Sequence, residues 1–157
     1  MATKETIISG MQQVIAEAKR VGAILDESGD WDVERQQGWT PKQMLSHVAA
    51  VGGMLPMSAP MLLSAAEDAD FTQSTDIGAL NAQSVAAMKD MSGPQIVQAL
   101  EANYGKAIEW VKTLPDEQLA LRRTFAKQTN HAGDILETIS VLHANHHLYE
   151  AVIRIPM

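Results

Sequence analysis

Apolar residues recur at helical spacing along most of this sequence, and this periodicity is the feature that most restricts the fold. Between Lys4 and about Asp26 the apolar residues follow one helical face, while the polar residues lie off that face. The apolar positions are Ile7, Ile8, Met11, Val14, Ile15, Ala18, Val21 and Leu25. The segment is therefore predicted to be an amphipathic helix.

A second helix carries a well-marked start. Thr40 stands at the N-cap position, Pro41 at the first helical position, and Gln43 three residues after the cap, where a capping box requires it. Trp39 precedes this cap and is expected to pack against Met44. The start of the helix is thus predicted from local chemistry alone.

The remaining helices follow from the same signals. The helix that begins at Pro41 is expected to run to about Leu55, because the prolines at positions 56 and 60 must bend or break its continuation. A second capping box at residues 92–95 begins a long helix that ends near Leu114. A short crossover helix over residues 77–88 and a last long helix over residues 132–154 complete the pattern.

Four long amphipathic helices and one short one predict an all-α fold, a four-helix bundle with a short extra crossover helix. No stretch is a convincing strand, and residues 115–130 are expected to be irregular, with a brief extended segment, LRRTF. The chain has 157 residues, of which 46% are hydrophobic, so it can bury a substantial core. We expect a single domain over residues 1–157.

Composition excludes several classes of function. The formal net charge is -7 and the basic residues are scattered, which argues against nucleic acid as a partner. There is no cysteine, so disulfides, thiolate metal sites and a cysteine nucleophile are excluded, and thiol chemistry would need an external thiol. The N-terminus lacks a secretory pattern, and no apolar run approaches the ~20 residues that span a bilayer. We expect a cytoplasmic protein without a membrane partner.

Three of the five histidines fall within five positions of the last predicted helix. His143 and His147 are four residues apart, so two ring nitrogens can converge on one metal ion at ~2.0 to 2.1 Å. In a chain with five histidines such a pair also arises by chance. His143, however, falls on the apolar stripe of that helix, which is expected to face the core. The stripe comprises Ile135, Ile139, Leu142, His143, His146, Glu150 and Ile153.

His47 is placed to join this pair. It lies on the inward face of the second helix, ~10 Å from the start of that helix, whereas the centre of the His143 and His147 pair lies ~13 Å from the end of the last helix. If the two helices run antiparallel, the three imidazoles lie at a similar height. The sequence therefore offers a metal site with three histidines and an open position for water or substrate.

The segments GWTPKQMLSHVAAV and LHANHHLYEAV resemble the DinB/YfiT superfamily of four-helix bundles, which are proposed metalloenzymes. Members carry one histidine on the second helix and an HxxxH pair on the last. The resemblance covers essentially the whole chain in helix order and length. It implies an up-down-down-up bundle, and it implies that His47, His143 and His147 are the metal ligands.

Two neighbouring residues leave alternatives open. His146 is additional to the superfamily pattern and borders the apolar stripe; it either packs beside the site or, less readily, replaces His147 as a ligand. Glu150 follows His146 by four residues and His147 by three. It could orient an imidazole or act as a catalytic base, but a solvated carboxylate near a helix end is the commoner case.

Several other features have a structural and a functional interpretation. Gly52 and Gly53 could permit close backbone approach, or they could merely weaken the helix that contains them. Arg122 and Arg123 could meet an acidic substrate, although a solvated pair is the commoner case, and His131 is expected to be an exposed loop histidine. A methionine cluster could be core filler, a pocket lining or the seam of a homodimer. It consists of Met44, Met54, Met57 and Met61.

An all-imidazole ligand set suits zinc, nickel or another late divalent metal. A di-iron carboxylate site is excluded because no ExxH motif occurs in the sequence. A zinc or nickel ion held by three histidines can activate water for hydrolysis or ionise an external thiol. Since some members of the superfamily are transferases that use low-molecular-weight thiols, we expect a thiol-dependent transferase or a hydrolase acting on a small electrophilic molecule. The alternative is a non-catalytic, metal-stabilised bundle that acts in association, as a stress-related dimer.

Overall fold

The computed structural model describes residues 1–35, 38–73 and 76–153. Its long helices are α1 (Lys4–Ser28), α2 (Pro41–Ser64), α4 (Gly93–Thr113) and a C-terminal helix in three parts, α6 (Ala132–Glu137), η2 (Thr138–Leu142) and α7 (His143–Val152). The shorter elements are α3 (Ile77–Ala87), α5 (Asp116–Ala120), β1 (Arg122–Phe125) and β2 (Gln128–His131).

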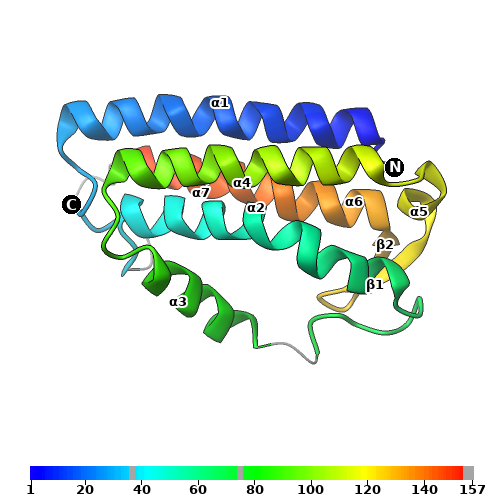
Figure 1. The fold of residues 1–157 in the computed structure, drawn as a ribbon. Coiled ribbons are helices and arrows are strands. Elements are labelled where there is room, and N and C mark those ends of the chain that lie inside the picture. The colour runs from blue at the N-terminus through cyan, green and yellow to red at the C-terminus, as the bar shows by residue number, and fades with distance from the viewer. Residues whose placement is uncertain (36–37, 74–75, 154–157) are drawn as a thin grey trace.

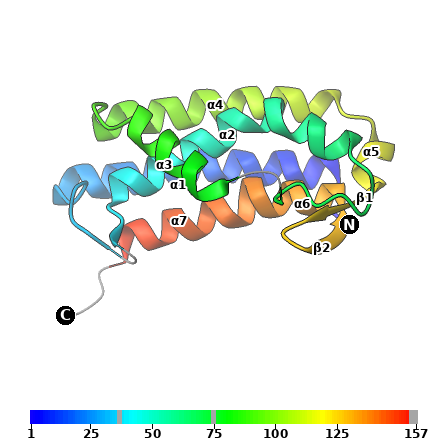
Figure 2. The same ribbon diagram turned by 90° about the horizontal axis from the view of Figure 1, so that it is seen from below.

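The four long helices form a bundle with up-down-down-up topology, as expected (Figure 1). Helices α2 and α4 run in one direction, and α1 and the C-terminal helix run in the other. Helix α3 lies outside the bundle alongside the first part of α2, and forms part of the crossover between α2 and α4 (Figure 2). This arrangement places the start of α2 beside the end of α7.

The long helices share one core of buried apolar side chains. Helices α1, α2 and α4 contribute the faces that their sequence periodicity predicts, because burial of apolar surface is the main favourable contribution to folding. Fully buried members include Ile7, Met11, Val14, Met44, Leu45, Ile96, Leu100, Tyr104, Leu136 and Leu148.

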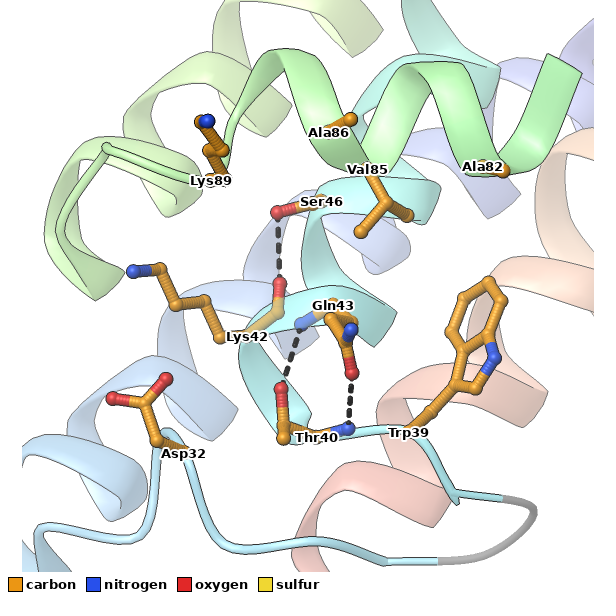
Figure 3. Close-up of a pocket in the computed structure, with 10 residues that line it drawn as sticks. All are labelled: Asp32, Trp39, Thr40, Lys42, Gln43, Ser46, Ala82, Val85, Ala86 and Lys89. Carbon is orange, nitrogen blue, oxygen red and sulfur yellow. Dashed lines mark hydrogen bonds between the residues drawn. The ribbon is translucent and has the colours of Figure 1, made fainter.

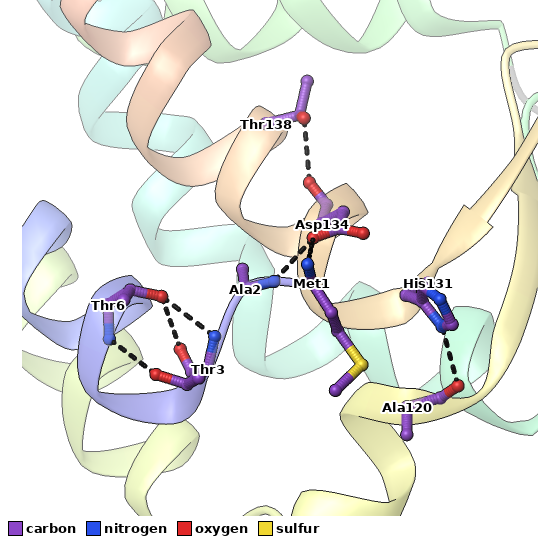
Figure 4. A network of polar contacts seen from close by, with 8 residues as sticks. All are labelled: Met1, Ala2, Thr3, Thr6, Ala120, His131, Asp134 and Thr138. Carbon is purple, nitrogen blue, oxygen red and sulfur yellow. Dashed lines mark hydrogen bonds and ion pairs between the residues drawn. The ribbon is translucent and has the colours of Figure 1, made fainter.

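Side-chain caps define where the helices begin. Capping boxes are present at Thr3, Thr40 and Ser92, the last two at the positions that the sequence predicts. Near the first of them, the backbone N–H of Ala2 donates to Asp134 Oδ1 at 2.6 Å (Figure 4). Because Asp134 lies in the first turn of α6, this bond joins the beginning of α1 to the beginning of the C-terminal helix.

Helix α2 continues beyond the end that the sequence predicts. It passes through Pro56 and Pro60 and ends at Ser64 instead of near Leu55, and Figure 1 shows it bending in its second half. The prolines therefore bend this helix but do not terminate it. By length and composition α2 could cross a membrane, contrary to the expectation from sequence, but 56% of its most apolar stretch is buried inside the bundle.

The segment expected to be irregular contains a short β-hairpin. Strands β1 and β2 pair antiparallel, with Phe125 opposite Gln128. The two residues between them, Ala126 and Lys127, have φ angles of 51° and 65°. Positive φ at both turn positions is typical of a type I′ hairpin, which usually carries Asn-Gly. The absence of that sequence signal explains why this hairpin was not predicted.

The sequence pattern suggested that the C-terminal helix is a regular α-helix throughout, but the structure differs in the middle of this helix. Its middle turn, Thr138–Leu142, is a π-helix, and the backbone N–H of His143 bonds to the carbonyl of Thr138. Because the π-helical turn is wider than an α-helical turn, the buried positions that follow it shift by about one residue toward the C-terminus. Consequently Leu142, predicted to face the core, is 59% exposed, whereas Ala144, Leu148 and Ala151 are buried.

Candidate metal centre

Helices α2 and α7 bring three imidazole rings together. Nε2 of His143 lies 3.3 Å from Nε2 of His47 and 3.0 Å from Nε2 of His147. One ring nitrogen of each residue lies within 4.8 Å of the others. The ring centroids of His47 are 5.0 Å from those of both other histidines, so the heights estimated from helix rise agree with the structure.

These distances suit a divalent metal ion. Ligand nitrogens ~2.0 to 2.1 Å from a tetrahedrally coordinated ion lie about 3.3 Å from one another. The two spacings at His143 are close to this value, and all the donors are imidazoles, which bind zinc, nickel and related ions. The residues present therefore fit a single divalent ion held by three histidines.

Glu150 supports one of these rings from behind. Nδ1 of His147 donates to Oε2 of Glu150 at 3.1 Å, which leaves Nε2 of the same ring without a proton and directed at the other histidines. Carboxylates commonly orient metal-binding histidines in this way. Glu150 is 7% exposed, so the expectation of a solvated carboxylate near the helix end is wrong.

His146 lies on the outer side of the same helix turn. Its side chain is 63% exposed, and its Nε2 contacts the other oxygen of Glu150, Oε1, at 3.2 Å. His147, not His146, completes the cluster of three imidazoles. His146 therefore lies beside the site, where it contacts Glu150 and its ring centroid is 5.6 Å from that of His147.

Burial keeps the three imidazoles neutral. Desolvation, and then repulsion from the neighbouring rings, lowers the pKa of His47 to about 4. The same causes lower the pKa of His143 to about 4, while a hydrogen bond to the backbone of Ile139 opposes the change. Desolvation also lowers the pKa of His147, against the opposing effect of Glu150. Near pH 7 the rings thus carry the unprotonated nitrogens that metal binding requires.

Packing between α2, α4 and the π-helix sets the position of the rings. A Cβ on Gly52 would lie 2.4 Å from Cδ2 of Tyr104, so only glycine allows α4 to approach α2 this closely. The buried hydroxyl of Tyr104 donates to the carbonyl of Ser140 in η2 at 3.0 Å. Of the two interpretations of Gly52, close helix approach is therefore confirmed. The hydrogen bond from Tyr104 to Ser140 holds the wide turn that precedes His143.

Trp39 forms a wall of the site, a role that the sequence pattern did not indicate. Its ring lies edge-on to His47 at a centroid distance of 5.6 Å and stacked with His147 at 6.1 Å. Its carbonyl accepts the backbone N–H of Arg35 at 2.8 Å, and the side chain of Arg35 bonds in turn to the carbonyl of Ala151. The loop before α2 is thereby attached to the end of α7.

A small pocket of about 230 Å³ opens onto the imidazoles. It is lined by Trp39, Met44, His47, Asn81, His143, His147 and Glu150. Asn81 comes from α3, so the crossover helix contributes to the site. The pocket leaves room beside the three nitrogens for a water molecule or a small reactant.

The remaining candidate residues lie elsewhere. The side chain of Arg123 donates to the carbonyl of Leu63 near the end of α2, so it is not simply solvated. His131 ends strand β2, and its Nδ1 lies 3.0 Å from the carbonyl of Ala120 (Figure 4). Met44 is buried in the core, but Met57 and Met61 are exposed, so core filling does not account for those two methionines.

Comparison of the sequence with protein-family models and with curated proteins gives no match. A solved structure is similar: YfiT from Bacillus subtilis, described as a probable metal-dependent hydrolase with an unusual four-helix bundle topology. The TM-score is 0.67 at 19% sequence identity, and the match covers 94% of this chain and 83% of YfiT. With its up-down-down-up helix order, this chain therefore has the YfiT-like four-helix-bundle fold.

Proposed function

We propose that this protein is a metal-dependent hydrolase that acts on a small electrophilic molecule, with His47, His143 and His147 as the ligands of one zinc or nickel ion. The observation that carries the proposal is the convergence of three neutral Nε2 atoms beside an open pocket. The description of YfiT as a probable metal-dependent hydrolase supports the same class of reaction.

The bound ion would supply Lewis-acid activation of a water or thiol ligand. The residues of the chain have separate roles around it. His47 and the two α7 histidines hold the ion, and Glu150 fixes the tautomer and orientation of His147. Trp39 and Asn81 line the pocket and so limit the size of the molecule that it can hold.

Transfer to a low-molecular-weight thiol is a second reaction that the same site could support. The chain has no cysteine of its own, so the thiol would be a second substrate. Thiol transfer and hydrolysis need the same ligand set and differ only in the nucleophile.

Metal analysis tests the ligand assignment. Purified protein is expected to bind about one zinc or nickel ion per chain, and His47→Ala and His143→Ala are expected to lose this binding. His146→Ala is the matched control, because it removes an exposed imidazole from the same helix and should retain the ion. Protein that binds no divalent ion, or that loses it equally in the control, contradicts the proposal.

Turnover assays then test the reaction. Zinc- and nickel-loaded protein would be incubated with a panel of activated esters and amides, with and without low-molecular-weight thiols. Release of product without thiol indicates a hydrolase, and product only with thiol indicates a transferase. Activity that persists unchanged in His143→Ala would show that it arises elsewhere.

A non-catalytic role in association is the competing function. The exposure of Met57 and Met61 on α2 is the observation that favours it, since exposed methionines are common at binding surfaces. In this case the protein would be a homodimer that Met57→Lys with Met61→Lys converts to a monomer in analytical ultracentrifugation. Metal binding that stabilises such a dimer without turnover of any substrate would favour this role.

A further inference from the structure

A second and larger cavity adjoins the pocket at the imidazoles. It has a volume of about 540 Å³ and lies between the beginning of α2 and helix α3 (Figure 3). Trp39 lines both cavities, and α3 borders both, with Asn81 at the imidazoles and Val85 at the larger cavity. The volume of this larger cavity is in the range of small-molecule sites.

The charged residues of this cavity gather at one end. Figure 3 shows Lys42 and Lys89 at the end away from Trp39, with Asp32 below Lys42. Within the described residues, neither ammonium group forms an ion pair or hydrogen bond. In a chain with a net charge of -7, a cavity with two lysines and one aspartate is locally positive.

The backbone at the start of α2 has no free donor to offer an anion. The N–H of Lys42 donates to the carbonyl of Trp31 at 3.0 Å, and that of Gln43 to Thr40 Oγ1 at 3.2 Å. Pro41 has no N–H. An anion in this cavity would therefore be held by side chains, of which those of Lys42 and Lys89 carry the positive charge.

Between the lysines and Trp39 the cavity is apolar on its α3 side, which consists of Ala82, Val85 and Ala86. Gln43 and Ser46 line the opposite side from α2, and Trp39 lies between this cavity and the imidazoles. A ligand that spans the cavity would thus meet cations at one end, apolar side chains in the middle and the histidine cluster beyond Trp39.

We propose that this cavity binds the anionic end of the substrate, which is an elongated organic anion with an apolar middle and its reactive group at the far end. Lys42 and Lys89 contact the anionic group, and Trp39 and Val85 contact the apolar part. The position of the reactive group rests on the function proposed above; the binding of the anion does not.

A matched pair of probes tests the charge preference without turnover. Binding of 4-phenylbutyrate and of its neutral amide would be measured on metal-free protein through the indole N–H of Trp39 in NMR titrations. The metal-free form is used because a carboxylate can bind a metal directly. The carboxylate is expected to bind several-fold more tightly than the amide.

Variants identify the groups responsible. Lys42→Gln and Lys89→Gln should each weaken carboxylate binding about two- to five-fold and leave the amide unchanged, as partly solvated ion pairs do. Asp32→Asn should strengthen carboxylate binding, because it removes the opposing charge. Lys106→Gln is the control, since this exposed lysine lies on α4 outside the cavity.

On metal-free protein, the inference would be overturned by equal affinity for carboxylate and amide, or by a preference that neither lysine variant reduces. A preference found only in zinc-loaded protein would also overturn it, since the carboxylate would then bind the ion. Absence of metal binding would contradict the proposed function and leave the result on metal-free protein intact. The two proposals can thus fail separately.

Discussion

Glu150 shows how a single buried carboxylate organises the site. One oxygen accepts from Nδ1 of His147, and the other contacts the exposed His146. The first contact selects the tautomer of His147 whose Nε2 faces the other rings. His143 has a comparable hydrogen bond to the backbone of Ile139, so two rings of the cluster are oriented from outside it.

The substitution Glu150→Gln should weaken zinc binding about 10- to 100-fold, because the amide retains the shape of the side chain but not its charge and can present a donor to Nδ1. The measurement is a competition titration with a chelating dye, together with ring ¹⁵N chemical shifts that report the tautomer of His147. Glu117→Gln on α5 is the control. An unchanged affinity and tautomer would show that Glu150 does not orient the ring.

At the scale of the elements, the π-helix η2 connects the fold to the site. It turns the chain so that α7 buries Ala144 and Leu148 while His143 and His147 face α2. Tyr104 on α4 holds this turn through Ser140, and Gly52 on α2 makes room for the Tyr104 ring. Three helices therefore determine the position of two histidines.

Gly52→Ala should destabilise the protein by about 1 to 3 kcal/mol, because its Cβ would force the Tyr104 ring to move. Gly105→Ala on α4 is the matched control: no heavy atom lies within 4 Å of its added Cβ, and the loss of helical glycine should stabilise by about 0.5 to 1 kcal/mol. Urea unfolding measures both changes. Zinc affinity should fall in Gly52→Ala alone; equal effects in both variants would contradict the steric argument.

At the scale of the whole molecule, the imidazole cluster makes folding depend on pH. The pKa of His47 and of His143 is about 4 in the folded protein and ~6.5 in the unfolded chain. Between these values the unfolded chain binds protons that the folded protein does not. Stability from these two groups is therefore complete above pH 6.5 and is lost as the pH falls toward 4.

Metal-free protein should thus lose stability between pH 6.5 and 5, with a slope of up to about 1.4 kcal/mol per pH unit for each imidazole. Urea unfolding at several pH values measures this slope, and the window lies above the range in which most carboxylates titrate. His47→Asn should make the dependence shallower, whereas His131→Asn, outside the cluster, should not. A flat profile in wild-type protein would mean that the rings are not buried as the structure describes.

Local signals in the sequence accounted for much of the molecule. Apolar periodicity predicted the long helices and the crossover helix, and the capping boxes predicted two of their starts, because both effects act over a few residues. The order and antiparallel packing of the helices then made a cluster of His47, His143 and His147 geometrically possible. Their spacing along two helices was enough to propose a shared ion.

Only the tertiary structure decided the features that depend on contacts between distant residues. The type I′ turn at Ala126 and Lys127 has no local sequence signal and is held in part by Asp70, which accepts the N–H of Lys127. The continuation of α2 through Pro56, the π-helix and the burial of Glu150 depend likewise on packing across the bundle. Such contacts join residues far apart in sequence, and their free energies outweigh local preference.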